Sequence, residues 1–296
     1  MQNLSTVLLI VLFSATGFAQ RLPQHNIYLF EMKQSTEGNY LFTKPRFLTG
    51  FNPTGYNNQP AFIDEDNLLI TAQLPNDTTQ TDIYHLNLKD QRLARFTQTM
   101  ESEFSPTPMP TVNNGPLSIS SVRVEADGKT QRLWEFPYNR TSNGQPVIRS
   151  LRDVGYHHWI RPKDVLLFLV GEPHNLASVN VDSEVPYNIT SNIGRCFQTL
   201  PNGDIAFVHK MGRSWLIKRI DPSNFRLELI TATLPDSEDF AVLPDGTFLM
   251  GNGQKLFKFH PNQDARWQEV ADFSYYGIGN ISRLAVKGNK LAVVVD

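Results

Sequence analysis

The stretch Leu243–Pro261, LPDGTFLMGNGQKLFKFHP, decides the fold of this chain. It combines a Pro-Asp-Gly turn, a short apolar strand, a turn that contains glycine, and a second strand with Leu256, Phe257 and Phe259. Weaker copies of this unit recur along the sequence. The recurrence predicts a repeat architecture built from short strands.

Six such units are recognisable, and their first residues are spaced at 45, 54, 38, 44 and 43 residues. The units begin near Tyr56, Glu101, Gly155, Ile193, Ser237 and Asn280. A period of about 40 to 50 residues with up to four short strands is typical of propeller blades. No segment has convincing helical periodicity, which excludes an alternating βαβ pattern. We therefore predict an all-β, six-bladed β-propeller.

The sixth unit has room for only two strands before Asp296. The segments Asn26–Lys33 and Phe47–Phe51 near the N-terminus supply two further strands. We predict that the last blade takes two strands from each end of the chain, which closes the ring and removes two exposed sheet edges. The ends of the mature chain should then lie together. In the second unit, Val147–Leu151 is the expected fourth strand.

The N-terminus differs in kind from the repeats. Residues 4–15 are almost wholly apolar, and small residues follow at Gly17 and Ala19. This pattern predicts a signal peptide over residues 1–19, cleaved after Ala19, followed by one propeller domain over residues 20–296. An uncleaved anchor helix is the alternative, although the apolar run is short for a bilayer of about 30 Å. We expect a periplasmic or secreted bacterial protein.

Composition limits the remaining possibilities. There are 27 basic and 29 acidic residues, and no run rich in Lys or Arg, so the sequence does not favour binding to nucleic acid. No later segment approaches 18 apolar residues, so no membrane span is expected in the mature chain. Cys196 is the only cysteine, which excludes an intrachain disulfide. We expect a monomer.

The unit that begins at Tyr56 carries a family pattern. It contains Pro60-Ala61-Phe62, a turn, the strand Leu68–Gln73, then Asp82–Leu88 (DIYHLNL) and Arg95-Phe96-Thr97. This pattern resembles the WD-like repeat of TolB-type propellers, in which Pro-Asp-Gly is the usual turn. The resemblance covers nearly the whole mature chain. It implies an exported bacterial six-bladed propeller, of a kind that mostly serves as a non-catalytic interaction module.

Motifs of the common enzyme classes do not occur. The sequence has no G-x-S-x-G elbow, no P-loop, no H-E-x-x-H and no glycine-rich dinucleotide turn. We therefore predict no catalytic residue. His157 and His158 are adjacent, and neighbouring residues on a strand point to opposite faces, so they do not form a predicted metal site together.

Polar residues recur where the units begin. In a propeller the innermost strands begin near the central channel, so these side chains should converge on one face and form a binding site. The predicted ligand-binding residues are Asn58, Glu101, Glu103, His157, Arg195, Glu238, Asp239 and Arg283, accompanied by Asn57, Tyr156 and Ser282. The alternative explanation is that a channel mouth is polar simply because it is wet.

Two function classes follow from these residues. The first is an exported, non-enzymatic propeller that recognises a protein, peptide or glycan at its central-channel face, without a cofactor. The alternative is a calcium-dependent hydrolase of the lactonase type. In that case Glu103, Glu238 or Asp239 would coordinate the cation together with Asn58, because carboxylate and amide oxygens suit Ca²⁺. The sequence leaves the ligand open.

Overall fold

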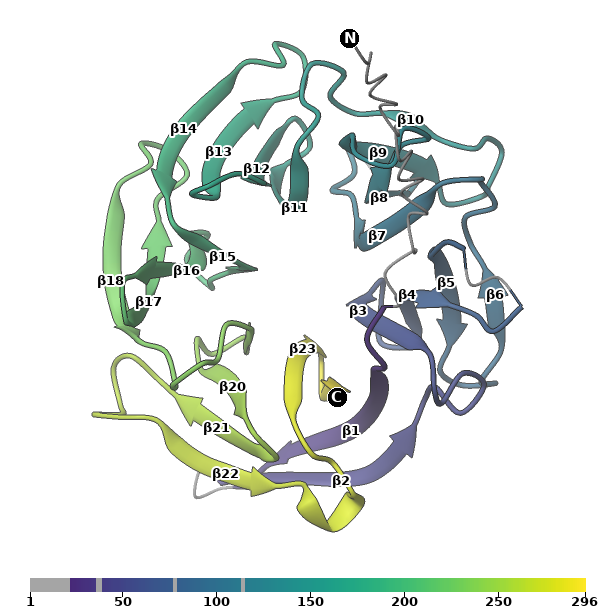
Figure 1. Cartoon of the computed structure of the whole chain (residues 1–296). Coiled ribbons are helices and arrows are strands. Elements are labelled where there is room, and N and C mark those ends of the chain that lie inside the picture. Colours follow the sequence, from purple (N-terminus) through teal and green to yellow (C-terminus); the bar gives the residue numbers. More distant parts are fainter. Residues whose placement is uncertain (1–21, 36–38, 77–78, 113–114) are drawn as a thin grey trace, which may run out of the picture.

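The computed structural model describes residues 22–35, 39–76, 79–112 and 115–296. Within these ranges the chain forms 24 strands in six four-stranded sheets, which are arranged as blades around a central axis (Figure 1). The predicted six-bladed β-propeller is therefore confirmed. The predicted signal peptide and its cleavage site lie outside the described residues. No helix in the described part of the chain is long and apolar enough to cross a membrane.

The first three blades follow one another in sequence. Blade 1 contains β3 (Tyr56–Phe62), β4 (Asn67–Gln73), β5 (Asp82–Asn87) and β6 (Leu93–Arg95). Blade 2 contains β7 (Ser102–Pro108), β8 (Ser118–Val124), β9 (Gln131–Pro137) and β10 (Gln145–Pro146). Blade 3 contains β11 (Val154–Arg161), β12 (Asp164–Leu169), β13 (Asn175–Asn180) and β14 (Pro186–Ser191).

The other three blades complete the ring. Blade 4 contains β15 (Ile193–Thr199), β16 (Ile205–Met211), β17 (Ser214–Ile220) and β18 (Leu227–Ala232). Blade 5 contains β19 (Phe240–Val242), β20 (Phe248–Asn252), β21 (Lys255–Phe259) and β22 (Gln268–Asp272), and the 3-10 turn η1 (Ser274–Tyr276) follows it. Blade 6 contains β23 (Ile281–Lys287), β24 (Lys290–Val295), β1 (Asn26–Gln34) and β2 (Tyr40–Phe47).

The turn chemistry of the Leu243–Pro261 stretch explains its shape. Gly246 has a φ of 90°, which glycine adopts without steric cost. The Asp245 carboxylate accepts a hydrogen bond from the Thr247 amide at 2.9 Å and so stabilises the turn. β20 and β21 then pair with Phe248 opposite Phe259. The stretch therefore supplies the two middle strands of blade 5.

Middle strands bury side chains on both faces because each blade lies between two others, and β24 shows this with apolar residues alone. In β24, Leu291, Val293 and Val295 pack in one hydrophobic cluster, whereas Ala292 and Val294 pack in another. Successive side chains of a strand point to opposite faces, so one strand contributes to two cores. This arrangement accounts for apolar runs such as LAVVV, which lack the alternation typical of a sheet with one wet face.

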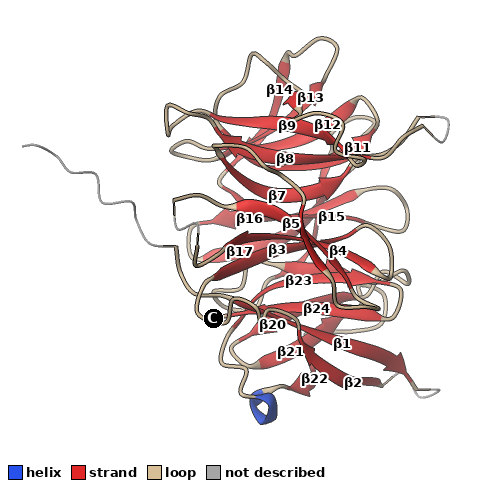
Figure 2. Ribbon diagram, turned by 90° about the vertical axis from the view of Figure 1, so that its right-hand side faces the viewer, coloured by secondary structure: helices blue, strands red, loops and turns tan. Residues whose placement is uncertain are grey.

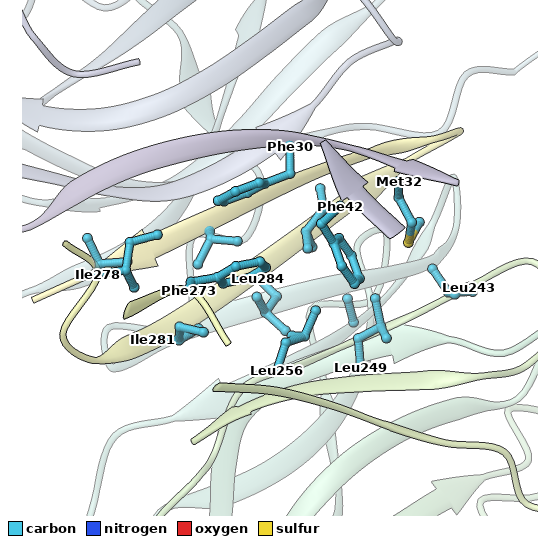
Figure 3. Packing of buried hydrophobic residues seen from close by; sticks show 14 residues of the cluster. Phe30, Met32, Phe42, Leu243, Leu249, Leu256, Phe273, Ile278, Ile281 and Leu284 are labelled. Carbon is cyan, nitrogen blue, oxygen red and sulfur yellow. The ribbon is translucent and has the colours of Figure 1, made fainter. Parts of the chain in front are cut away.

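The N-terminal strands seal the ring where blade 6 meets blade 5 (Figure 3). Phe30 of β1 stacks on Phe273, which follows β22, with ring centroids 4.4 Å apart and an interplanar angle of 11°. Phe42 of β2 packs edge-on against the same Phe273 ring at 5.7 Å. Leu249 and Leu256 of blade 5 complete the contact. The side chains that close the propeller thus come from opposite ends of the sequence.

The predicted closure of the last blade is also confirmed at its backbone. β1 pairs antiparallel with β24, from Asn26 opposite Val295 to Glu31 opposite Lys290. The His25 ring and the Asp296 carboxylate approach to 3.0 Å. Seen from the side, the C-terminus lies on one of the two loop-bearing faces (Figure 2). The beginning and the end of the folded ring therefore meet on that face.

One N-terminal strand was placed wrongly from the sequence. The second strand of the closing pair is Tyr40–Phe47, not Phe47–Phe51. β2 is the outermost strand of its sheet, where Pro45 loses no ladder hydrogen bond, and Lys44 beside it takes a φ of 51° at an irregularity. Thr49 instead belongs to a turn, where its hydroxyl accepts a hydrogen bond from the Ile27 amide at 3.1 Å.

The fourth strand of blade 2 was also misplaced. The prediction was Val147–Leu151, but the outer strand is the two-residue β10. Beyond it, the Arg132 guanidinium donates to the carbonyl of Arg149, and Ile148 is fully buried. The Val147 amide still donates to the Leu133 carbonyl of β9 at 2.9 Å, but from Ile148 on the segment packs through a side chain and an arginine contact.

The contact of Phe30 and Phe42 with Phe273 allows a test of how the ring closes between blades 5 and 6. Phe30→Ala should lower the free energy of unfolding by about 3–5 kcal/mol, because it deletes a fully buried ring and leaves a cavity. Urea unfolding followed by circular dichroism measures this. Tyr275→Ala is the matched control, since this neighbouring ring is 89% exposed, and should change stability by less than about 0.5 kcal/mol. Equal effects of the two variants would contradict the assigned role of Phe30.

Candidate functional site

The inner strands of the six blades enclose a central cavity of about 160 Å³, called here the channel cavity. Each blade contributes to its wall, through Gln59, Ser105, Tyr156, Arg195, Asp239 and Arg283 among others. Asp239 directly precedes β19, and the other five residues belong to the inner strands themselves. The site is therefore assembled from segments that lie far apart in the sequence.

Irregular strand pairing decides which side chains reach the channel. In β3 the register shifts between Asn58 and Ala61, and Gln59 at the irregularity has a φ of 54°. In β7 the equivalent residue is Ser105, with a φ of 55°, and its amide donates to Gln59 Oε1 at 2.8 Å. The inner strands β11, β15 and β23 have register shifts as well. A bulge re-aims side chains, so simple alternation does not give the channel-facing set.

Three charged side chains from blades 4, 5 and 6 form the centre of the site, called here the Arg-Asp-Arg cluster. Arg195 Nε donates to Asp239 Oδ2 at 2.8 Å, and Arg195 Nη2 lies 2.7 Å from the same oxygen. Arg283 Nη1 lies 3.6 Å from Asp239 Oδ1. The Asp239 side chain is 10% exposed and that of Arg195 31%, so the carboxylate is largely removed from water while Arg195 is partly in contact with it. One carboxylate therefore lies between two guanidinium groups.

Arg283 is held by blade 3 as well. Its Nη2 donates to the Tyr156 hydroxyl at 3.0 Å, and its guanidinium carbon lies 5.3 Å from the centre of the Tyr156 ring. Burial disfavours the charged form of Arg283, but Asp239 and Tyr156 outweigh burial and raise its pKa above the ordinary value. Arg283 is therefore a fixed positive charge at neutral pH.

A second cavity of about 320 Å³, called here the mouth cavity, adjoins the first. Asp239, Arg195 and Arg283 line both cavities, so the Arg-Asp-Arg cluster lies at their junction. The mouth cavity includes Asn280, whose amide donates to Asp296 Oδ2 at 2.8 Å. It therefore opens near the face on which the chain ends.

Glu238 fixes the wall of the mouth cavity. Its Oε1 accepts a hydrogen bond from the Arg195 amide at 2.7 Å, and its Oε2 pairs with Lys210 Nζ at 3.0 Å. A Cβ atom added to Gly251 would lie 2.3 Å from Ile281 Cγ2, so glycine there lets β20 approach β23 beside Arg283. The backbone around the Arg-Asp-Arg cluster is therefore tightly determined.

The two adjacent histidines point to different neighbours. His157 Nε2 lies 2.7 Å from the Ser120 hydroxyl of blade 2, which also accepts a hydrogen bond from Trp159 Nε1 at 2.9 Å. His158 Nε2 lies 2.8 Å from the Thr199 hydroxyl of blade 4. Burial lowers the pKa of His157 to about 3 and that of His158 to about 4. Both rings are therefore neutral at pH 7.

The predicted site residues separate into two groups. His157, Arg195, Asp239 and Arg283 line the channel cavity, and Glu238 lines the mouth cavity. Asn58, Glu101 and Glu103 line neither. Of the accompanying residues, Tyr156 lines the channel, Ser282 lines the mouth, and Asn57 is buried where its amide donates to the carbonyl of Asn52 at 2.8 Å. Their role in ligand binding stays a prediction.

Glu103 has structural partners elsewhere. It is fully buried, and its Oε1 accepts hydrogen bonds from Arg123 Nε at 2.9 Å and from Thr99 at 2.5 Å. The Arg123 guanidinium carbon lies 3.8 Å from the centre of the Trp134 ring. Burial raises the pKa of Glu103, although Thr99 and Arg123 act in the opposite direction. Glu103 thus joins a polar core of blade 2 instead of meeting Asp239.

Sequence reasoning missed several channel residues, including Gln59, Ser105 and Gln198. A signal was present for the first two. Gln59-Pro60 in β3 and Ser105-Pro106 in β7 place a polar residue before proline at matching points of two blades. Proline within a strand marks an irregularity, and both positions are bulged. Among the residues that the structure describes, no three His, Cys, Asp or Glu side chains are grouped as a metal site.

Comparisons with known proteins place the fold. Among solved structures, the putative TolB from Agrobacterium tumefaciens is similar at 13% identity with a TM-score of 0.65, covering 92% of this chain and 98% of that chain. TolB from Acinetobacter baumannii is similar at 13% identity with a TM-score of 0.57, covering 92% of this chain and 64% of that chain. This chain has the fold of the TolB-type six-bladed propellers.

The TolB-type fold also occurs in chains with other names. A putative gluconolactonase is similar at 10% identity with a TM-score of 0.58, covering 90% of this chain and 97% of that chain. No family model and no curated protein matches the sequence. Likeness at these identities establishes the fold alone, and a fold does not by itself determine function.

The Arg-Asp-Arg cluster predicts a large effect of removing its carboxylate. Asp239→Ala should lower the free energy of unfolding by about 3 kcal/mol or more, because two arginines lose their shared partner in a largely buried place. Chemical denaturation measures this. Asp182→Ala is the matched control, since its ion pair with Lys163 is more than 60% exposed on both sides, and should cost less than about 1 kcal/mol. A small effect at Asp239 would show that the cluster is not a coupled unit.

The buried His157 predicts a pH dependence of stability. The folded-state pKa of about 3 lies below the ordinary 6.5, so the unfolded chain binds a proton that the folded chain does not. Stability present above pH 6.5 is therefore lost as the pH falls toward 3, at about 1.4 kcal/mol per pH unit for one histidine. His157→Gln should flatten the dependence between pH 4 and 6 by about that slope. Urea unfolding at several pH values measures this.

The control for this experiment is His174→Gln, which changes an exposed histidine. It should keep the wild-type dependence on pH. Parallel curves for His157→Gln and the wild type would contradict the assigned burial of an uncharged ring.

Proposed function

We propose that this chain is a non-enzymatic binding module that holds part of a protein, peptide or glycan at the mouth of its central channel. The observation that supports this most is the Arg-Asp-Arg cluster, placed by three blades at the junction of two cavities. Convergent polar groups in a concave site are the usual form of a ligand site. The charges of the Arg-Asp-Arg cluster thus lie next to cavity volume that a ligand can occupy.

The physical argument is preorganisation. Asp239 and Tyr156 fix the guanidinium groups of Arg195 and Arg283 before any ligand arrives. A ligand group that pairs with them therefore loses little free energy to side-chain ordering. Arginine is also enriched among the residues that dominate binding free energies, especially where it is surrounded by protein. The fixed arginines therefore favour ligand binding over the alternative explanation, in which the channel is polar only because water fills it.

The proposal includes a cellular location outside the cytoplasm. The apolar stretch over residues 4–15, followed by Gly17 and Ala19, supports export from the cytoplasm of a bacterium. A binding partner would then be an envelope or extracellular molecule. The TolB-type fold is compatible with such a role, and the site residues named above are those that would carry it.

Affinity capture with matched variants tests this function. The immobilised wild type and two variants, Arg195→Ala and Arg226→Ala, are exposed to an envelope extract of the source organism. Arg195→Ala should reduce recovery of a specific partner by about tenfold or more, because it removes a central anchor. Arg226, with a side chain 74% exposed at the outer edge of blade 4, serves as the control and should leave recovery unchanged.

Two outcomes would count against a binding module. One is the absence of any partner that distinguishes Arg195→Ala from Arg226→Ala, with both variants shown to be folded by thermal unfolding. The other is turnover of lactone substrates that depends on calcium, accompanied by calcium-dependent thermal stabilisation. That second result would favour the hydrolase alternative.

A further inference from the structure

The channel cavity carries an excess of positive charge. Among the described residues that line it, the groups charged at pH 7 are two guanidinium groups, those of Arg195 and Arg283, and one carboxylate, that of Asp239. His157 and His158 are uncharged there because burial lowers the pKa of each. One positive charge thus lacks a counter-charge within the cavity. The Arg283 side chain is only 13% exposed, so its charge interacts more strongly with an anion than it would in open water.

The spare hydrogen-bonding capacity lies on Arg283. Asp239 is bound mainly by Arg195, through two nitrogen atoms at 2.7 and 2.8 Å. Arg283 approaches Asp239 only to 3.6 Å, which exceeds hydrogen-bond distance, and donates one hydrogen bond to Tyr156 at 3.0 Å. A guanidinium group has five N–H donors, and they match the planar fork of a carboxylate. The Tyr156 hydroxyl also keeps a proton that it can donate.

We propose that the junction of the two cavities binds the free carboxylate at the C-terminus of a peptide, which pairs with Arg283 and accepts a hydrogen bond from Tyr156. This inference rests on the binding function proposed above and names its ligand chemistry. The bound carboxylate balances the excess charge of the channel cavity. It also completes an arrangement of two guanidinium groups and two carboxylates.

The walls favour a peptide end over other carriers of negative charge. On the channel side, Pro60, Pro106 and Leu284 form apolar wall that suits a terminal side chain. On the mouth side the wall is polar, with Asn252 Nδ2 donating to the Ser237 hydroxyl at 3.1 Å, and this suits the backbone that precedes the terminal residue. Cavities of about 160 and 320 Å³ are large enough for the last residues of one peptide chain.

The rim of the mouth cavity supplies a second discriminating feature. Asp236 is an exposed residue that lines this cavity, whereas the neighbouring Glu238 is already paired with Lys210 at 3.0 Å. A polyuronate, which carries a carboxylate on every sugar, would bring further negative charges next to Asp236, and like charges repel. A peptide with one terminal carboxylate avoids that repulsion. The channel cavity carries the positive charge of the arginines, and the mouth cavity carries an acidic side chain. This distribution favours a ligand whose single negative charge lies at its end.

Peptide binding with and without the carboxylate tests the inference. The probes are a library of N-acetylated tetrapeptides as free acids and the same library as C-terminal amides, with binding followed by saturation-transfer NMR at pH 7. The free acids should bind, and the best of them should lose about 10- to 100-fold in affinity as the amide, which is the range for a hydrogen bond to a charged group. Equal binding of acid and amide would overturn the inference.

Variants locate the carboxylate. Arg283→Lys keeps the charge but removes the planar fork, and should weaken the best free acid by about tenfold or more. Tyr156→Phe keeps the ring that packs on Phe168 at 5.6 Å and removes only the hydroxyl, so about a fivefold loss is expected. Arg226→Gln is the control and should bind as the wild type does. Thermal unfolding verifies that each variant is folded, and unchanged affinity in Tyr156→Phe and Arg283→Lys together would overturn the assignment.

Other results separate this inference from the proposed function. Binding of an oligogalacturonate but of no peptide would overturn the peptide assignment. Failure of every free acid, while affinity capture still yields a partner that Arg195→Ala loses, would overturn the inference and leave the binding function standing. Failure of both experiments would overturn both.

Discussion

The pairing of β1 with β24 is the contact on which the rest of the structure depends. The middle strands of the blades bury side chains, mainly apolar ones, on both faces, so each blade needs two neighbours to exclude water from them. An open row of six such blades would leave two apolar faces exposed. Backbone pairing between the two ends of the chain completes blade 6 and supplies the missing neighbours. The hydrophobic effect therefore favours the closed ring as a whole.

Closure also determines where charge can be placed. The Arg-Asp-Arg cluster takes one side chain each from blades 4, 5 and 6, and Tyr156 from blade 3 holds it on the far side. These residues span well over a hundred positions in the chain, and only the ring brings them within contact distance. A largely buried set of charges is stable there because each member has a partner fixed by a rigid strand.

The same geometry separates structural from accessible charge. Glu103 and Arg123 form a fully enclosed pair within blade 2, whereas Arg195, Asp239 and Arg283 line open space. Both sets pair arginine with a carboxylate. Glu103 lies directly opposite Arg123 in the regular part of the β7–β8 ladder, so that pair is enclosed within the blade. Arg195 and Arg283 lie at register shifts of β15 and β23 and face the cavity. This difference makes the second set the better candidate for recognition.

The sequence by itself determined the architecture, because repeat spacing, turn chemistry and apolar strands are local properties, and counting strands at the two ends predicted how the ring closes. It also named Arg195, Asp239 and Arg283 among the channel residues. It misplaced β2 and β10, because both are outermost strands and one is irregular and the other only two residues long. It also assigned Glu103 to the mouth, because the sequence does not show that Arg123 lies opposite it in the ladder. Only the tertiary structure decided which polar residues meet, because bulges and contacts between blades set that direction.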